Sequence, residues 1–178
     1  MTPSRPARLL LTGIVALFLA AVGCGYHTSA HAVRLPKDMH TIYVPAFVNQ
    51  SHTYRLEQTL TASVVRELRS RTNYRVITTN DGTADATLSG TLLNTAIAPL
   101  TYNAQTGGIS SGLIFVAMKM SLVSSKGKVL WDDPNLLYRD QYQIANNGKD
   151  FFEEESPALD RLASNFAQSL VADMLEAY

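Results

Sequence analysis

A run of 14 uncharged residues, Leu9 to Val22, is followed after one glycine by the only cysteine of the chain, Cys24. Arg5 and Arg8 lie just before the run. A helix that spans a bilayer needs about 20 apolar residues, so this run is typical of the apolar part of a secretory signal peptide rather than of a membrane span. We therefore expect residues 1–23 to be a signal peptide that takes no part in the fold, which leaves a mature chain of ordinary single-domain size.

The segment Ala21-Val22-Gly23-Cys24 resembles the lipobox of bacterial lipoproteins, in which small residues precede a cysteine. The resemblance implies cleavage between Gly23 and Cys24, a diacylglyceryl group on the Cys24 thiol and an acyl chain such as palmitate on the new amine. Ala21 departs from the leucine that is commoner in the family. An exported chain with one cysteine cannot form an internal disulfide, so the alternative is an unmodified thiol. Two or three lipid chains would anchor the protein, because each buried CH₂ contributes about 0.8 kcal/mol.

Residues 24–39 carry no periodic pattern, and glycine, serine and proline among them suit an extended tether. Residues 40–178 predict one domain. The full chain holds 15 Lys or Arg against 15 Asp or Glu, a formal net charge of +0. Because proteins that bind nucleic acids carry a basic patch or stripe, we expect no nucleic-acid partner.

The periodicity of the domain predicts the element order β-α-β-β-β-β-α. Strands are predicted over residues 41–49, 74–79, 84–98, 113–123 and 129–144, the last interrupted by an Asp-Asp-Pro sequence, and helices over residues 53–71 and 157–178. Each helix has one apolar stripe. Two such helices would cover one face of a four- to five-stranded, mainly antiparallel (mixed) sheet, which is an α+β fold.

Four local features refine this prediction. Pro45 removes a donor from the first strand, so that strand should lie at an edge or bulge there. Ser51 or Thr53 can cap the first helix. The alternation of the 84–98 strand slips near Leu92, which predicts a bulge. The polar, glycine-rich residues 101–112 are predicted to form a loop.

The sequence offers no pattern for catalysis or metal binding. It has neither a nucleophile elbow nor a paired acid and base, and its histidines, His27, His31, His40 and His52, lack ligand spacing. The acidic run at residues 150–155 lacks the spacing of a calcium loop, and the dipole of the helix that follows explains it. We expect no enzyme, no cofactor and no metal.

Lys126 and Lys128 flank Gly127 at a predicted hairpin tip, and Lys119 lies on the strand before it. An exposed turn often carries lysines for solubility alone. Ammonium groups on a rigid turn can also pair with the phosphate of a lipid headgroup. We treat Lys126 and Lys128 as candidate lipopolysaccharide contacts.

The sequence resembles the LPS-assembly lipoprotein family, LptE, over nearly all of its mature length. The resemblance depends on the order of its motifs: Cys24-Gly25-Tyr26-His27, the strand 42–49, the helix 56–68, the segment 84–90, the hairpin leading to Val129-Leu130-Trp131 and the amphipathic helix at the end. The glycine that follows Cys24, Gly25, resembles what is found at this position in lipoproteins that are sorted to the outer membrane.

The resemblance implies a partner and a task. The partner would be the large β-barrel translocon LptD, in whose lumen such a lipoprotein sits as a plug, and the task would be to help that barrel assemble and to assist lipopolysaccharide to the outer leaflet. The protein would then be lipid-anchored at the periplasmic face of the outer membrane. The opening strand and helix also resemble periplasmic lipoproteins of the CsgG and LpoB type, which build secretion pores or activate cell-wall synthases.

Overall fold

The computed structural model describes residues 39–176 apart from 106 and 144–156. Five sheet positions follow the order β3-β1-β4-β5-β6, and a short strand, β2, also pairs with β4. The strands are β1 (Thr41–Tyr43), β2 (Val48–Asn49), β3 (Arg75–Ile77), β4 (Ala86–Tyr102), β5 (Ile109–Ser124) and β6 (Val129–Gln143), and the helices are α2 (Leu56–Arg71) and α3 (Pro157–Glu176). This confirms the predicted α+β class and the predicted element order.

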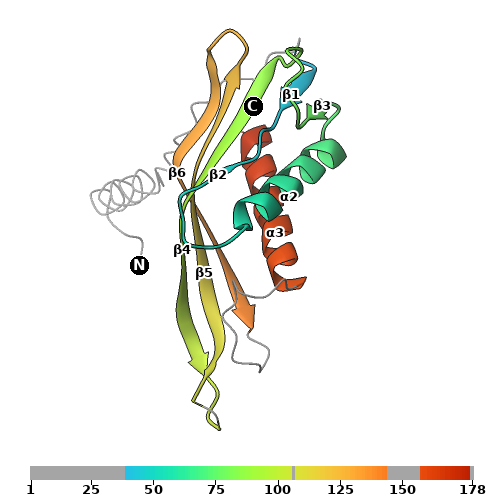
Figure 1. Cartoon of the computed structure of the whole chain (residues 1–178). Coiled ribbons are helices and arrows are strands. Elements are labelled where there is room, and N and C mark those ends of the chain that lie inside the picture. Colours follow the sequence, from blue (N-terminus) through green and yellow to red (C-terminus); the bar gives the residue numbers. More distant parts are fainter. Residues whose placement is uncertain (1–38, 106, 144–156, 177–178) are drawn as a thin grey trace, which may run out of the picture. The chain divides into compact units, whose positions relative to one another are not determined.

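The sheet is mixed in direction. β1 runs parallel to both β3 and β4, whereas β4, β5 and β6 form an antiparallel meander. Because parallel strands need a crossover, α2 connects the segment of β1 and β2 to β3. Both helices lie on the same face of the sheet (Figure 1), and the opposite face is left without a layer of its own among the described residues.

The core lies between the helices and the strands. α2 contributes leucines and valines at the spacing of one helix face, and α3 contributes a stripe that includes Phe166. Phe166 packs edge-on against Tyr138 of β6, with 5.6 Å between ring centroids. The largest fully buried side chains are Phe166, Ile42, Leu56, Leu60, Leu68, Leu88, Leu92, Ile114, Met118, Met120, Leu122 and Leu170.

The predicted first strand, 41–49, is broken into two. β1 ends at Tyr43 and β2 begins at Val48, so the chain leaves the sheet around Pro45, where proline cannot donate to a ladder. The break also shifts the alternation: Phe47 is buried, whereas Ala46 and Val48 are exposed. An unbroken alternation over residues 41–49 predicts that Ala46 and Val48 share a face with Ile42 and Val44. The prediction is wrong, because an irregular segment does not keep a period of two.

The start of the first helix also differs from the prediction. α2 begins at Leu56 rather than at Thr53, and Arg55 precedes it in the left-handed region with φ 58° and no capping side chain. The hydroxyl group of Thr53 lies 2.6 Å from that of Thr95 on β4, so it serves the sheet instead of the helix. The Ser51 hydroxyl accepts a hydrogen bond from the Thr53 amide at 3.2 Å and caps no helix.

Half of the predicted loop at residues 101–112 is strand. β4 continues to Tyr102 and β5 begins at Ile109, so polar side chains there pair across a hairpin. The bulge predicted near Leu92 is confirmed, because the register shifts between Leu92 and Asn94. β6 runs on through Pro134 with a register shift instead of stopping there. A serine just before a helix is a favoured N-cap, which predicts that role for Ser156 ahead of Pro157, and Ser156 lies outside the described residues.

Candidate functional site

The turn between β5 and β6, here called the lysine turn (Ser124–Lys128), carries both candidate lipopolysaccharide contacts. Gly127 adopts φ 79°, and its amide donates to the Ser124 carbonyl at 2.9 Å. The Lys128 amide donates to the Ser124 hydroxyl at 3.0 Å. The Lys126 and Lys128 side chains are exposed. Two ammonium groups are therefore presented on a well-defined turn, which is the geometry that the sequence predicted.

Lys119 is not part of this turn. It pairs with Thr91 of β4 and is exposed on the sheet face away from the helices. Five strand residues lead from it to Ser124, where the turn begins, which corresponds to about 17 Å. The structure therefore brings together two of the three lysines and leaves the third on the open face.

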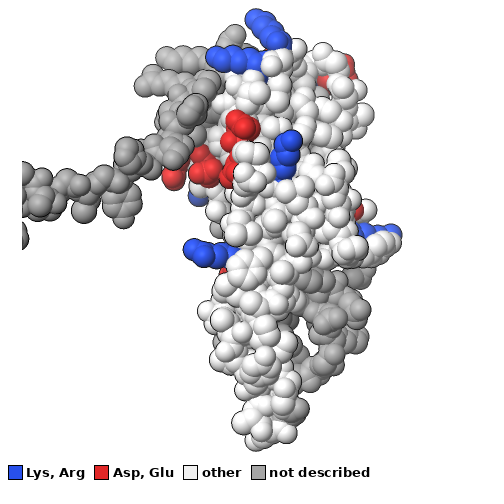
Figure 2. All heavy atoms as spheres, turned by 90° about the vertical axis from the view of Figure 1, so that its left-hand side faces the viewer, with Lys and Arg blue, Asp and Glu red and all other residues white. Residues whose placement is uncertain are grey.

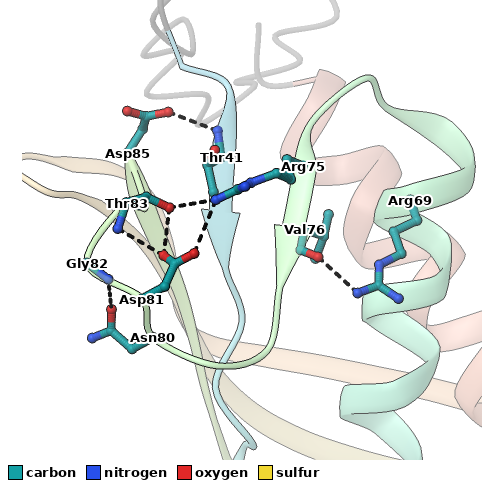
Figure 3. A network of polar contacts seen from close by, with 9 residues as sticks. All are labelled: Thr41, Arg69, Arg75, Val76, Asn80, Asp81, Gly82, Thr83 and Asp85. Atoms are coloured by element: carbon teal, nitrogen blue, oxygen red, sulfur yellow. Dashed lines mark hydrogen bonds and ion pairs between the residues drawn. The ribbon is translucent and has the colours of Figure 1, made fainter.

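The lysine turn is connected to the start of the described chain through Asp85. The Ser125 amide donates to the Asp85 carbonyl at 2.7 Å. The Asp85 carboxylate accepts hydrogen bonds from the His40 and Thr41 amides, each at 2.8 Å, and Figure 3 shows the second of these. These two amide donors lower the pKa of Asp85. The sequence reasoning missed this carboxylate, because the acceptor and its donors lie more than 40 residues apart.

A second polar network closes the connection from β3 to β4 (Figure 3). Arg75 donates to the Asp81 carboxylate at 3.2 Å and to the Thr83 hydroxyl at 2.6 Å. The Thr83 hydroxyl and amide both donate to Asp81, and these hydrogen bonds lower its pKa more than the nearby Arg75 charge does. Every partner lies within nine residues of the others, so this network orders a turn.

The opposite end of the sheet has no charge. From Ala86 to Met118 the chain contains no Lys, Arg, Asp, Glu or His, although these 33 residues form two long strands and their turn. We call residues 93–115 the distal hairpin. Figure 2, a view of the open sheet side, shows charged side chains only over the upper part of the face and none over its lower end.

Exposed apolar side chains concentrate in the same region. Of the large hydrophobic side chains that are exposed in the described residues, most lie on β2, on the loop before α2 or on the distal hairpin, and we call them the apolar edge: Val48, Tyr54, Leu93, Leu100, Tyr102 and Ile109. Tyr54 is 77% exposed and its ring stacks under the Arg55 guanidinium at 4.9 Å. Aromatic and apolar groups left open in this way mark contact surfaces.

The side formed by β6 and α3 is acidic. Burial first, and the Asp133 and Glu176 carboxylates next, raise the pKa of Asp173. On the same side, Asp140 accepts hydrogen bonds from Tyr138 at 3.3 Å and from Asn165 at 3.2 Å. These contacts join the last strand to the last helix and give the two sides of the sheet different charges.

The described residues hold no group of three or more His, Cys, Asp or Glu side chains that could bind a metal ion. His40 and His52 are exposed and far apart in the chain, whereas His27 and His31 lie outside the described residues. The acidic run at 150–155 lies outside them as well. So do Gly23 and Cys24, the residues of the predicted cleavage and lipidation site. In the part of the chain that the structure covers, no helix is long and apolar enough to cross a membrane.

The family described as "LptE: Lipopolysaccharide-assembly" matches residues 39–174 of the chain. No curated protein matches the chain. Among solved structures, the PelC dodecamer from Paraburkholderia phytofirmans is 15% identical with a TM-score of 0.51, and the alignment covers 77% of this chain and 88% of that chain. The hypothetical protein CT253 from Chlamydia trachomatis is 8% identical with a TM-score of 0.53, over 78% of this chain and 97% of that chain. At these identities the likeness shows a shared fold alone.

Proposed function

Because the chain belongs to the LptE family of lipopolysaccharide-assembly proteins, we propose that it is an outer-membrane lipoprotein that plugs an LptD-like β-barrel. It helps that barrel assemble and assists the transport of lipopolysaccharide to the outer leaflet. The observation that carries the proposal is the family match, which spans the described fold from Met39, two residues before β1, almost to the end of α3.

The proposal includes a lipid anchor at Cys24, with the signal peptide removed after Gly23. The described fold begins at Met39, which is buried. Residues 24–38 would then join the lipid to the fold. The acyl chains would hold the protein at the periplasmic face of the outer membrane.

A plug must present a surface that suits a barrel lumen, which is polar. The open face of β4 and β5 supports this role, because Thr87, Ser89, Thr91 and Ser121 point to that face opposite the buried residues of the same strands. Hydroxyl groups can hydrogen-bond to a lumen wall without the desolvation cost of a charge.

The lysine turn is the proposed contact for lipopolysaccharide phosphate. Each lysine near an anionic lipid surface contributes about 1 kcal/mol, so the double variant Lys126→Ala/Lys128→Ala should weaken binding of purified lipopolysaccharide by about tenfold or more. Arg161→Ala removes an exposed charge from α3 and is the matched control. Equal affinity of the two variants would remove these lysines from the proposal.

Depletion in the native host tests the function as a whole. Loss of the chain should lower both surface lipopolysaccharide and the amount of mature barrel, and normal levels of both after depletion would reject the proposal. Mass spectrometry of the purified chain tests the anchor separately, because a plug enclosed by the barrel stays in the membrane with or without its lipid. The chain should begin at Cys24 and carry the mass of the acyl groups, and an unmodified Cys24 thiol would reject the anchor.

The CsgG- or LpoB-like alternative predicts a different assembly. The chain shares its fold with a protein that forms a dodecamer. Under this alternative, the chain could form a ring of identical copies. The mass of the purified lipoprotein complex separates the two, because a plug gives one copy with one barrel.

A further inference from the structure

The uncharged end of the fold identifies which surface meets the barrel. From the apolar edge and the unpaired border of β4, we infer that the distal hairpin and the loop before α2 contact the barrel wall, whereas the β6 and α3 side does not. This inference rests on the proposed function, because it assigns a surface to the partner named there.

The first argument is the free border of β4. β1 and β2 pair with β4 only as far as Leu92, so from Asn94 onward its outer border pairs with no strand of the described residues. The loop before α2 reaches it at one point, through the hydroxyl contact between Thr53 and Thr95. An unpaired strand border attracts other strands unless something covers or guards it.

The second argument compares the two borders of the sheet. β6, the border on the other side, carries Asp132, Asp133, Pro134, Arg139 and Asp140, which are the charges and proline that natural proteins place on an exposed strand. The free part of β4 has Pro99 and two register shifts beside it, which also guard a border, but it has no charge. The two borders therefore differ in charge: charged side chains suit the β6 border to water, whereas the free part of β4 has none.

The free border of β4 suits a polar barrel wall as its cover. A charged side chain enclosed in a narrow lumen loses water and is costly unless it finds a partner, whereas threonine, asparagine and tyrosine can hydrogen-bond to a polar wall. The 33 uncharged residues from Ala86 to Met118 meet that condition. The exposed rings of Tyr54 and Tyr102 supply the kind of side chain that dominates binding energy at interfaces.

The place where the described chain begins agrees with this assignment. The chain begins at Met39, the next residue donates to Asp85, and Asp85 is bonded to the lysine turn. The distal hairpin lies at the opposite end of β4 and β5, after about 50 Å of strand. The described fold therefore begins at its charged end, and the uncharged end lies away from that point.

Site-specific photocrosslinking of the full lipidated chain in outer membranes of the native host tests the inference. A benzophenone amino acid at Leu100 or Tyr102 should give adducts with the barrel, and the same group at Val129 or Leu137 should not. The control positions are matched in exposure, since Leu100 is 48% exposed and Leu137 is 57% exposed.

A charge substitution supplies the second measurement. Leu100→Glu should reduce the barrel recovered with the tagged chain by about tenfold or more, because it encloses an unpaired charge, whereas Leu137→Glu should not. Circular dichroism of both purified variants checks that each is folded.

The outcomes separate the inference from the proposed function. If no barrel is recovered with the wild-type chain, the function fails. If the barrel is recovered but adducts form only from Val129 and Leu137 and Leu100→Glu keeps the complex, the function stands and the inference is overturned. Adducts at Leu100 that join two copies of the chain, or that carry only lipid, would also overturn it.

Discussion

The two halves of β4 share one strand and one composition but have different surroundings. From Ala86 to Leu92 the side chains alternate between the buried helix side and the open side, and the strand is paired on both borders. From Leu93 to Tyr102 no residue is buried, and only β5 pairs with it. The helices pack against the first half, and the second half projects beyond the strands that flank the first. The proposed contact surface therefore begins where packing against the helices ends.

Leucine-to-alanine changes on the two halves should give the largest difference. Leu88 is fully buried, so Leu88→Ala should lower the free energy of unfolding by about 3 kcal/mol. Leu100→Ala should lower it by less than about 0.5 kcal/mol, because that side chain is half exposed and packs on no core. Urea denaturation of the mature domain measures both. Equal losses would show that the two halves are packed alike.

A glycine in the first half should be the next most sensitive position. A Cβ on Gly90 would lie 2.8 Å from the Met120 sulfur and 2.8 Å from a Phe47 ring carbon. Gly90→Ala should therefore cost about 2 kcal/mol through overpacking. Ser89→Ala, on the exposed neighbour, is the control and should change stability little. A Gly90→Ala protein as stable as the wild type would mean that Phe47 does not hold this position.

The junction before the first half should depend on pH. The pKa of Asp85 is lowered in the fold by hydrogen bonds from the His40 and Thr41 amides, so its carboxylate stabilises the protein above the ordinary carboxyl pKa and that contribution is lost as the pH falls through the folded-state value. Asp85→Asn should cost about 1 kcal/mol at pH 7, since the site is partly solvated. Unfolding titrations should show that the difference in free energy of unfolding between the wild type and Asp85→Asn is smaller at pH 3 than at pH 7. The same difference at both pH values would contradict the prediction.

The acidic side should give the smallest effect, with the opposite sign. The pKa of Asp173 is raised, first by burial and then by Asp133 and Glu176, so ionisation at neutral pH destabilises the fold. Asp173→Asn should stabilise the protein at pH 7 by about 0.5 kcal/mol at most, because the group is largely solvated. The gain should disappear as the pH falls below the ordinary carboxyl pKa. Thermal melts of the wild type and of Asp173→Asn at pH 7 and pH 3 measure both effects. A lower melting temperature of the variant at pH 7 would contradict the prediction.

Element type could be predicted from the sequence wherever a period was regular. The apolar stripe of α2 and the alternation from Ala86 to Leu92 gave the right elements, and the slip near Leu92 was identified as a bulge. The lysine turn was predicted because its glycine and lysines are adjacent in the chain. Local chemistry of this kind is visible without a fold.

Features that depend on contacts between distant segments could not be predicted. The polar residues around Thr101 read as a loop, because a strand stabilised only by its hairpin partner needs no apolar alternation. Thr53 looked like a helix cap, yet its hydroxyl finds Thr95, 42 residues away. The apolar edge escaped notice for the same reason, because Val48 and Tyr54 reach the border of β4 only through the pairing of β2 with β4 and the contact between Thr53 and Thr95.

Affinity purification of the tagged, lipidated chain from outer membranes of its native host, followed by mass analysis of the intact complex, tests whether the chain plugs a barrel. We predict one large outer-membrane β-barrel bound to a single copy of the chain. A complex made only of copies of this chain, or a purified chain with no barrel attached, would contradict it.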